Sequence, residues 1–228
     1  MRSDYRTVFP RQFNRRIKTE KRVYSKFLKK MHPKIKKYYV YLGNHKDERR
    51  RFIHKLYHDR CVYCGATVKL MDLSNFQIDH IVSKDVLYKR HISDEKIHSI
   101  YNLVPACRSC NRQKSNFVPK KKESERLLNP DENLLDQVFY RDERYYIRIS
   151  DGFKENDDIK AFYQKLQLGN QIKRMDYLLM QIDTLLKELK SPEYLRKHGL
   201  HESVEVRKLI DTLRDEYDEV LGRRRIEG

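Results

Sequence analysis

The sequence predicts an α+β fold built around a small ββα unit, with flanking helices, a β-hairpin and a C-terminal helical hairpin. Three observations predict it. Two C-x-x-C pairs enclose an apolar stretch that ends in an Asp-His dipeptide. Residues 137–150 alternate between apolar and polar side chains, as the strands of a hairpin do. Two later segments carry apolar residues at helical spacing, which is typical of amphipathic helices.

Three regions are expected along the 228 residues. They are a basic helical N-terminal region at 1–60, the cysteine-bracketed unit at 61–117, and the hairpin with the C-terminal helices at 118–228. No apolar run approaches the roughly 18 residues of a membrane span, and the opening MRSDYRTVFP lacks the apolar core of a signal peptide. We therefore expect a soluble, cytoplasmic protein with no membrane partner.

The N-terminal region predicts two helices. Residues 11–31 are helix-prone and basic, and Pro33 follows them. The aromatic and β-branched stretch 36–43 predicts a short strand or a packed turn. A second helix is expected through 47–59, with Asn44 as its N-cap.

The C-terminal region predicts a loop, a hairpin and two helices. Residues 118–135 read as a loop with a short helical piece, and 137–150 as a hairpin with its tip at Arg141–Glu143. One apolar stripe ends at Ser191-Pro192 and consists of Met175, Leu178, Leu179, Ile182, Leu185, Leu186 and Leu189. The other is expected between a Ser203 cap and a Gly222 stop and consists of Val206, Leu209, Ile210, Leu213, Tyr217, Val220 and Leu221. Such stripes usually form the seam of a helical hairpin, and a partner-binding surface is the alternative.

Lysine and arginine are concentrated in the first quarter of the chain. Residues 1–60 carry a net charge of +15, against +3 for 61–150 and −1 for 151–228. A basic block beside near-neutral segments indicates a surface for a polyanion. We expect nucleic acid rather than an anionic membrane, because the block lacks a bulky apolar face. The side chains expected to contact phosphate are Arg15, Arg16, Lys18, Lys21 and Arg22.

The four cysteines form two knuckles, Cys61/Cys64 and Cys107/Cys110. A disulfide framework is typical of smaller secreted chains, and a redox dithiol would need only one pair. Two C-x-x-C knuckles in an intracellular protein instead predict four thiolates around one structural Zn²⁺. The 42 residues between the knuckles exceed a simple zinc ribbon, so a further unit is inserted there.

That inserted segment contains the Asp79-His80 pair. Taken alone, such a pair is more often a structural hydrogen bond than a catalytic site. A zinc ion joining the knuckles would bring the strand that carries Asp79 and His80 close to Asn102 and Asn111. A second strand near Asn102 and a helix that begins around Cys107 complete a ββα unit. In it, Asp79 and Asn111 can present oxygen atoms to a hard divalent cation.

These residues resemble the HNH endonucleases, a family with a ββα-metal fold. The matching positions are His80, Asn102 and Asn111, the variant in which asparagine replaces the last histidine, and the four cysteines match a zinc-binding subtype. The resemblance covers residues 61–114 and includes N-L-V-P-A-C-x-x-C-N-x-x-K in register.

The resemblance implies four catalytic positions. Asp79 and Asn111 would hold Mg²⁺ or Mn²⁺ against the scissile phosphate, and His80, neutral at pH 7, would take a proton from the attacking water. Asn102 is expected to fix the loop around His80 rather than touch the metal. An asparagine ligand suits Mg²⁺ and makes tight capture of Zn²⁺ or Ni²⁺ at this second site less favourable.

Several basic residues and histidines lie beside this constellation. Lys114, Arg108 and Arg112 are expected to contact phosphate, with a solvated basic helix as an equal alternative. His91 and His98, between the two strands, are expected to be surface histidines, with assistance to the leaving group as the alternative.

The sequence thus predicts a zinc-stabilised, Mg²⁺-dependent endonuclease that cuts DNA. Outside 61–114 the layout resembles stand-alone HNH nucleases of bacterial defence systems such as Septu and retron modules, which implies an anti-phage effector with an ATPase partner. The alternative is a non-catalytic zinc module that binds nucleic acid or docks on an ATPase. Such a module has no use for Asp79, His80 and Asn111 together.

Overall fold

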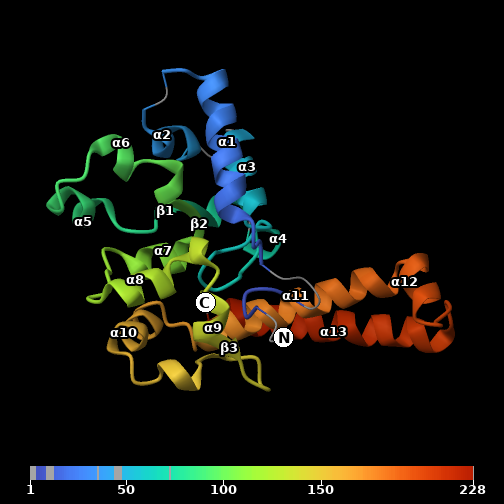
Figure 1. Ribbon diagram of the computed structural model, residues 1–228. Helices are drawn as coiled ribbons and strands as arrows, with labels where there is room; N and C mark the ends of the chain where they lie inside the picture. The colour runs from blue at the N-terminus through green and yellow to red at the C-terminus, as the bar shows by residue number, and fades with distance from the viewer. Residues whose placement is uncertain (1–3, 9–12, 35, 44–47, 72, 228) are drawn as a thin grey trace.

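A computed structural model describes residues 4–8, 13–34, 36–43, 48–71 and 73–227 (Figure 1). Within them the fold is α+β: two small two-stranded antiparallel sheets lie among numerous helices. The predicted class is therefore confirmed, and the ββα unit, the β-hairpin and the C-terminal helical hairpin follow in the expected order.

Among the described residues before the first knuckle there are three helices: α1 (Ile17–Met31), α2 (Tyr38–Gly43) and α3 (Glu48–Leu56). The prediction of a short strand or packed turn at 36–43 is wrong, because Tyr38–Gly43 form helix α2. Tyr38 and Leu42 are one helical turn apart and both are buried, so packing of one helix face outweighs the β-propensity of the aromatic residues. The predicted cap of the next helix, Asn44, lies outside the described residues.

In Figure 1 the ββα unit lies below the N-terminal helices. Strands β1 (Phe76–His80) and β2 (Leu103–Cys107) pair antiparallel, with Phe76 opposite Cys107 and His80 opposite Leu103, and α7 (Arg108–Lys114) follows directly. All five residues of β2 are buried. Before β1 lie α4 (Val68–Met71) and a short 3-10 turn (Leu73–Asn75). Between the strands lie α5 (Lys84–Lys89), α6 (Asp94–Ile97) and a second 3-10 turn, Ile100–Asn102.

The chain then covers the ββα unit from the other side. The predicted loop with a helical piece contains α8 (Lys122–Leu128), and the predicted hairpin is formed by β3 (Phe139–Arg141) and β4 (Ile147–Ile149). Its tip spans 142–146 rather than Arg141–Glu143, because Arg141 still pairs with Ile147. The remaining elements of this part are 3-10 turns at Pro130–Glu132 and Asp151–Phe153, with α9 (Leu135–Val138) and α10 (Asp157–Lys165).

One hydrophobic core runs from Tyr5 to Leu168. It includes side chains from the N-terminal helices, both knuckles, both strands of the ββα unit, and the hairpin with α10. The first two predicted regions and the start of the third therefore share one interior. We call this part of the molecule the body.

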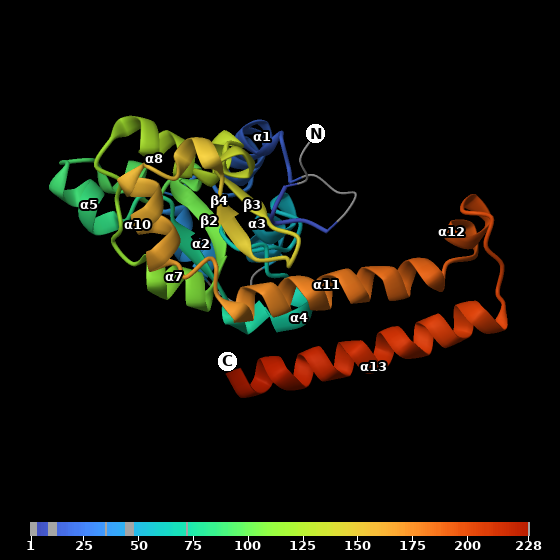
Figure 2. The same ribbon diagram turned by 90° about the horizontal axis from the view of Figure 1, so that it is seen from below.

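The C-terminal helices form an arm that projects from the body (Figures 1 and 2). It consists of α11 (Gln171–Leu189), α12 (Pro192–Lys197) and α13 (Val204–Glu227), with α11 and α13 side by side. Ser203 caps α13, since its hydroxyl accepts a hydrogen bond from Val206 N at 3.3 Å. The predicted stop at Gly222 is corrected, because α13 continues to Glu227. A helical glycine costs about 1 kcal/mol, and the ion pair between Arg224 and buried Asp176 of α11 favours the extra turn.

The arm's helices are amphipathic rather than uniformly apolar. None of the helices in the described part of the chain combines the length and the hydropathy required to cross a bilayer.

Candidate metal centre and catalytic site

The four cysteines meet inside the body. Their Sγ atoms all lie within 4.8 Å of one another, all four residues are buried, and Cys64 Sγ is 3.8 Å from Cys107 Sγ. A tetrahedron with Zn–S bonds of about 2.3 Å separates its sulfur atoms by about 3.8 Å. The cluster therefore has the donor chemistry and the size that Zn²⁺ requires.

Each knuckle is shaped by local backbone geometry. Gly65 follows the first knuckle with φ of +81°, and a Cβ there would stand 2.4 Å from the carbonyl oxygen of Arg6. Both the left-handed backbone and this close approach require glycine. In the second knuckle Cys107 is the N-cap of α7, and its Sγ accepts a hydrogen bond from Cys110 N at 3.5 Å.

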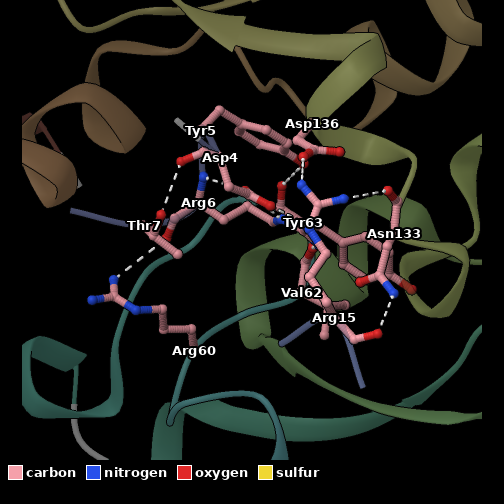
Figure 3. Close-up of polar contacts among 10 residues, drawn as sticks. All are labelled: Asp4, Tyr5, Arg6, Thr7, Arg15, Arg60, Val62, Tyr63, Asn133 and Asp136. Carbon is pink, nitrogen blue, oxygen red and sulfur yellow. Dashed lines mark hydrogen bonds and ion pairs between the residues drawn. The ribbon is translucent and has the colours of Figure 1, made fainter. Parts of the chain in front are cut away.

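The N-terminal segment buttresses the first knuckle (Figure 3). Arg6 is fully buried, pairs with Asp4 at 2.7 Å, and donates a hydrogen bond to the carbonyl of Val62 at 3.2 Å. The Tyr5 hydroxyl donates to the carbonyl of Tyr63 at 2.7 Å. Residues more than 50 positions away in sequence thus hold the backbone between Cys61 and Cys64.

A cation from the arm also lies near the sulfurs. Burial alone lowers the pKa of Lys173, but the negative charge of the four cysteines raises it above the ordinary lysine value. A buried ammonium group here offsets part of the net negative charge that four thiolates leave on a divalent metal.

Asp79 lies on the face of β1 that α7 covers. Lys114 of α7 contacts both carboxylate oxygens, at 3.3 Å from Oδ1 and 3.0 Å from Oδ2, and Tyr63 donates a hydrogen bond to Oδ2 at 2.8 Å. Lys114 also donates to the carbonyl of His80 at 2.8 Å. Burial raises the pKa of Asp79 above its usual value, and the attraction of Lys114 only partly opposes this.

His80 ends β1 and contacts different elements from Asp79, as alternation along a strand requires. Its Nε2 lies 3.0 Å from His98 Nδ1, and the Tyr39 ring of α2 packs against it with 4.6 Å between centroids. Burial, then the nearby charges of His98, Lys114 and Lys84, lower the pKa of His80 to about 4. The imidazole is therefore neutral at pH 7, the form that can accept a proton.

Asn102 holds the chain where it leaves β1. Its Oδ1 accepts a hydrogen bond from Val82 N at 2.9 Å, and its Nδ2 donates to the carbonyls of Val82 and Ile97, both at 3.0 Å. All three partners are backbone groups of the segment between the strands. This is the position expected of a residue that fixes the loop after His80.

Asn111 lies on α7 and faces β1. Its Nδ2 donates a hydrogen bond to Gln77 Oε1 at 2.6 Å. Gln77 and Asp79 are two residues apart on one strand, so they share a face. The structure thus brings Asn111 and Asp79 to the same side of β1, although each has its own protein partner.

The oxygen atoms of Asp79 and Asn111 have the chemistry that a hard cation such as Mg²⁺ or Mn²⁺ prefers. The Lys114 ammonium group shows that positive charge is favourable beside the Asp79 carboxylate. The residues therefore fit a divalent cation in donor type, and a cation bound to Asp79 shares or replaces the contact with Lys114.

The predicted phosphate contacts divide into exposed and buried groups. Two of them differ from the prediction: Lys21 and Lys114 are buried and ion-paired, so a phosphate in solvent cannot reach their ammonium groups. Lys21 pairs with Asp131 at 2.5 Å and donates to the carbonyl of Leu103 at 2.8 Å. The side chains that do face solvent are Arg15, Arg16, Lys18, Arg22, Arg108 and Arg112.

Two of these exposed side chains already have acidic partners. Arg15 pairs with Asp136 at 2.5 Å (Figure 3) and Lys18 with Glu132 at 2.6 Å. The Lys18 pair is weak and exchanges readily for phosphate, whereas Arg15 is held more firmly, because the Asp136 side chain is only 9% exposed.

Sequence reasoning missed four contacts at the site. Tyr63 forms a hydrogen bond with Asp79 and Gln77 forms one with Asn111, His98 lies at hydrogen-bond distance from His80, and the Tyr39 ring packs against the His80 ring. The alternation of strand residues was a usable signal for Gln77. The other three partners come from elements outside the strand, and nothing in the local pattern identifies them.

Comparison with known proteins agrees with this geometry. Residues 61–117 match the model of the HNH endonuclease family, and this span begins at the first knuckle, contains β1 and β2, and ends just after α7. The chain thus contains an HNH endonuclease domain with four cysteines positioned to bind a metal, and this domain supports a nuclease-type function. No curated protein and no solved structure matched the chain.

Proposed function

We propose that the HNH domain is a metal-dependent endonuclease that hydrolyses phosphodiester bonds in DNA. The observation that carries the proposal is the end of β1. There a buried, neutral His80 follows directly on Asp79, and Asn111 of α7 lies on the Asp79 side of the strand. Cys61, Cys64, Cys107 and Cys110 would hold a structural zinc, which would keep α7 and the first knuckle together.

Asp79 and Asn111 would hold Mg²⁺ or Mn²⁺, which when bound supplies positive charge to the scissile phosphate and the leaving oxygen. His80 accepts a proton from the attacking water, and the water oxygen forms the new bond to phosphorus. The ester bond to the leaving oxygen breaks, and that oxygen takes a proton from solvent. Asn102 keeps the chain after His80 in place, through its bonds to Val82 and Ile97.

The DNA backbone would be bound by exposed arginines and lysines. We assign this role to Arg15, Arg16, Lys18 and Arg22 of the N-terminal region and to Arg108 and Arg112 of α7. Each phosphate contact contributes about 0.9 to the slope of log affinity against log salt concentration. Changing Arg108 and Arg112 to Gln should therefore lower that slope by about 2, while Lys21 is left out of the proposed surface because it is buried.

The test of catalysis is cleavage of plasmid DNA by the purified full chain with Mg²⁺, with Mn²⁺, and with chelator. His80→Ala should lower the rate by about 10²–10⁴, because the general base is lost. Its zinc content and DNA affinity should stay at the wild-type values. A wild-type protein that binds DNA and zinc but cuts no DNA with either metal contradicts the proposal.

A second candidate function is a non-catalytic zinc module that binds nucleic acid or docks on an ATPase. The observation that favours it is the occupation of both Asp79 oxygens by Lys114 and Tyr63. The plasmid assay separates the two candidates, since the module binds DNA without cutting it.

The resemblance of the chain's layout to stand-alone nucleases of bacterial defence systems supports a further proposal, an anti-phage role in the cytoplasm. Its test is phage challenge of cells that carry the wild-type gene or His80→Ala. Equal plaque numbers in the two strains contradict that role without touching the enzymatic proposal.

A further inference from the structure

The segment between β1 and β2 places a second histidine, His98, next to His80. His98 is the C-cap of α6 and lies 18 positions after His80, yet its Nδ1 is 3.0 Å from His80 Nε2. On its other side, His98 Nε2 lies 3.4 Å from Asp94 Oδ1. The three side chains therefore form a chain of contacts that ends on His80.

This chain of contacts is anchored at several points. Lys37 forms an ion pair with Asp94 Oδ2, and the Tyr88 hydroxyl donates to Asp94 Oδ1 at 2.5 Å. The Tyr39 ring lies beside both imidazoles, with centroid distances of 4.6 Å to His80 and 5.7 Å to His98.

The position of the carboxylate decides where the protons lie. A carboxylate only accepts hydrogen bonds, so Asp94 favours a proton on His98 Nε2. The Nδ1 of a neutral His98 then has no proton and must accept one from His80 Nε2–H. His80 Nδ1 is left with its lone pair, which is the atom that can take a proton from water.

We propose that Asp94 and His98 are positioning residues that hold His80 in its Nε2–H tautomer, with Nδ1 presented as the base. The inference rests on the proposed function, because it assigns His80 the role of general base. It also gives the segment between the strands a role in the reaction, and His98 is then not a surface histidine.

The sharpest test is Asp94→Asn. In the wild type, Lys37 pairs with Asp94 Oδ2, and Oδ1 faces Tyr88 and His98. In the variant, Lys37 attracts the oxygen of the new amide group. The amide nitrogen then takes the position of Oδ1 beside Tyr88 and His98. An N–H group in that position favours a His98 Nε2 without a proton, so the proton of His98 moves to Nδ1. His98 Nδ1–H then donates to His80 Nε2, and the proton of His80 moves to Nδ1, where it blocks the base.

The first readout is the tautomer of His80 in the full-length, zinc-loaded protein at pH 7, measured by long-range ¹H–¹⁵N correlation of the imidazole nitrogens. We expect Nε2–H in the wild type and Nδ1–H in Asp94→Asn. The second readout is steady-state cleavage with Mg²⁺, in which kcat should fall by about 10²–10⁴ at unchanged KM.

His91→Asn is the matched control. His91 lies in the same segment, is exposed, and has a φ of +55°, which asparagine tolerates. Neither the tautomer nor the rate should change in it. His98→Ala is the second variant: it should lower kcat without changing zinc content or KM, since the ring that orients His80 is gone.

An unchanged His80 tautomer in Asp94→Asn overturns the inference, whether or not the protein cuts DNA. So does an unchanged kcat in both Asp94→Asn and His98→Ala when the wild type is active. A wild type that shows the expected tautomers and cuts no DNA contradicts the proposed function instead, because the tautomer is measured without cleavage.

Discussion

The body and the arm of this molecule differ in how many of their charged side chains are buried. The body buries charged groups in ion pairs. Asp4 pairs with Arg6 two residues away, whereas Lys21 and Lys114 pair with Asp131 and Asp79 from distant parts of the chain. Apart from the buried Lys173 and Asp176 near the start of α11, the arm keeps most of its charges in water, in pairs one helical turn apart such as Lys187–Asp183 and Arg214–Asp211.

Apolar side chains are also packed more extensively in the body than in the arm. The body has one continuous core, whereas α13 has a single buried residue, Val206, in a small cluster with Leu189 and Leu195. The structure of the body therefore depends on many long-range contacts that support one another, while the outer part of the arm is held by a small apolar cluster where α11, α12 and α13 meet. Damage to the body should therefore be costly and global, and damage to the arm mild and local.

Loss of a metal ligand should have the largest effect. Cys107→Ser removes one of four sulfurs that join the first knuckle to α7, and structural zinc sites contribute on the order of 10 kcal/mol to folding. We expect loss of zinc and of the body's tertiary structure, measured by metal analysis and near-ultraviolet circular dichroism. Intact zinc-free protein with a native spectrum would show that the cysteine cluster is not a structural metal site.

Breaking a buried ion pair should rank second. Lys21→Met leaves the buried Asp131 carboxylate with the Tyr57 hydroxyl and without its cation, which should lower the free energy of unfolding in urea by about 3–5 kcal/mol. Asp131→Asn added to Lys21→Met should recover part of the loss, because a neutral amide replaces the unpaired charge.

The matched control for this pair is in the arm. Lys187→Met breaks an exposed pair of α11 and should cost no more than about 0.5 kcal/mol. Equal losses in Lys21→Met and Lys187→Met would remove the distinction between body and arm.

The buried imidazole of His80 should make the body sensitive to acid. Its pKa of about 4 lies below the ordinary value of about 6.5, so the unfolded chain binds the proton first. Stability from this group is fully present above pH 6.5 and falls as the pH drops toward 4, by about 2 kcal/mol at pH 5.

The measurement compares urea unfolding of wild type and His80→Gln at pH 7 and pH 5. The wild type should lose about 2 kcal/mol more than the variant, because only the wild type has the shifted histidine. Parallel losses would show that His80 titrates as an ordinary histidine.

A cavity in the arm should have the smallest effect. Val206→Ala removes two methyl groups from the small cluster with Leu189 and Leu195, which should cost about 1–2 kcal/mol. Hydrogen exchange should rise in α12 and α13 while the body's amides keep their protection. Increased exchange in β1 and β2 would show that the arm's seam is coupled to the site.

Local patterns in the sequence determined much of this protein. The spacing of the cysteines predicted the metal centre, the Asp-His pair and Asn111 predicted the ββα unit, and helical periodicity predicted α11 and α13. Each of these patterns is either a periodicity within one helix or strand, or the spacing of residues that bind one metal ion. Such patterns can be recognised in the sequence even when the tertiary contacts of the element are unknown.

Only the tertiary structure decided which charges are buried and which partners the site residues have. Lys21 reads as one more basic residue of a helix, and its burial depends on Asp131, 110 positions away. The sequence predicted a surface histidine at His98, and only the fold places His98 next to His80. Residues 38–43 form a helix because Tyr38 and Leu42 share one buried face. The physical reason is common to all three: burial and pairing are free energies of contacts between distant segments, and the local sequence does not contain them.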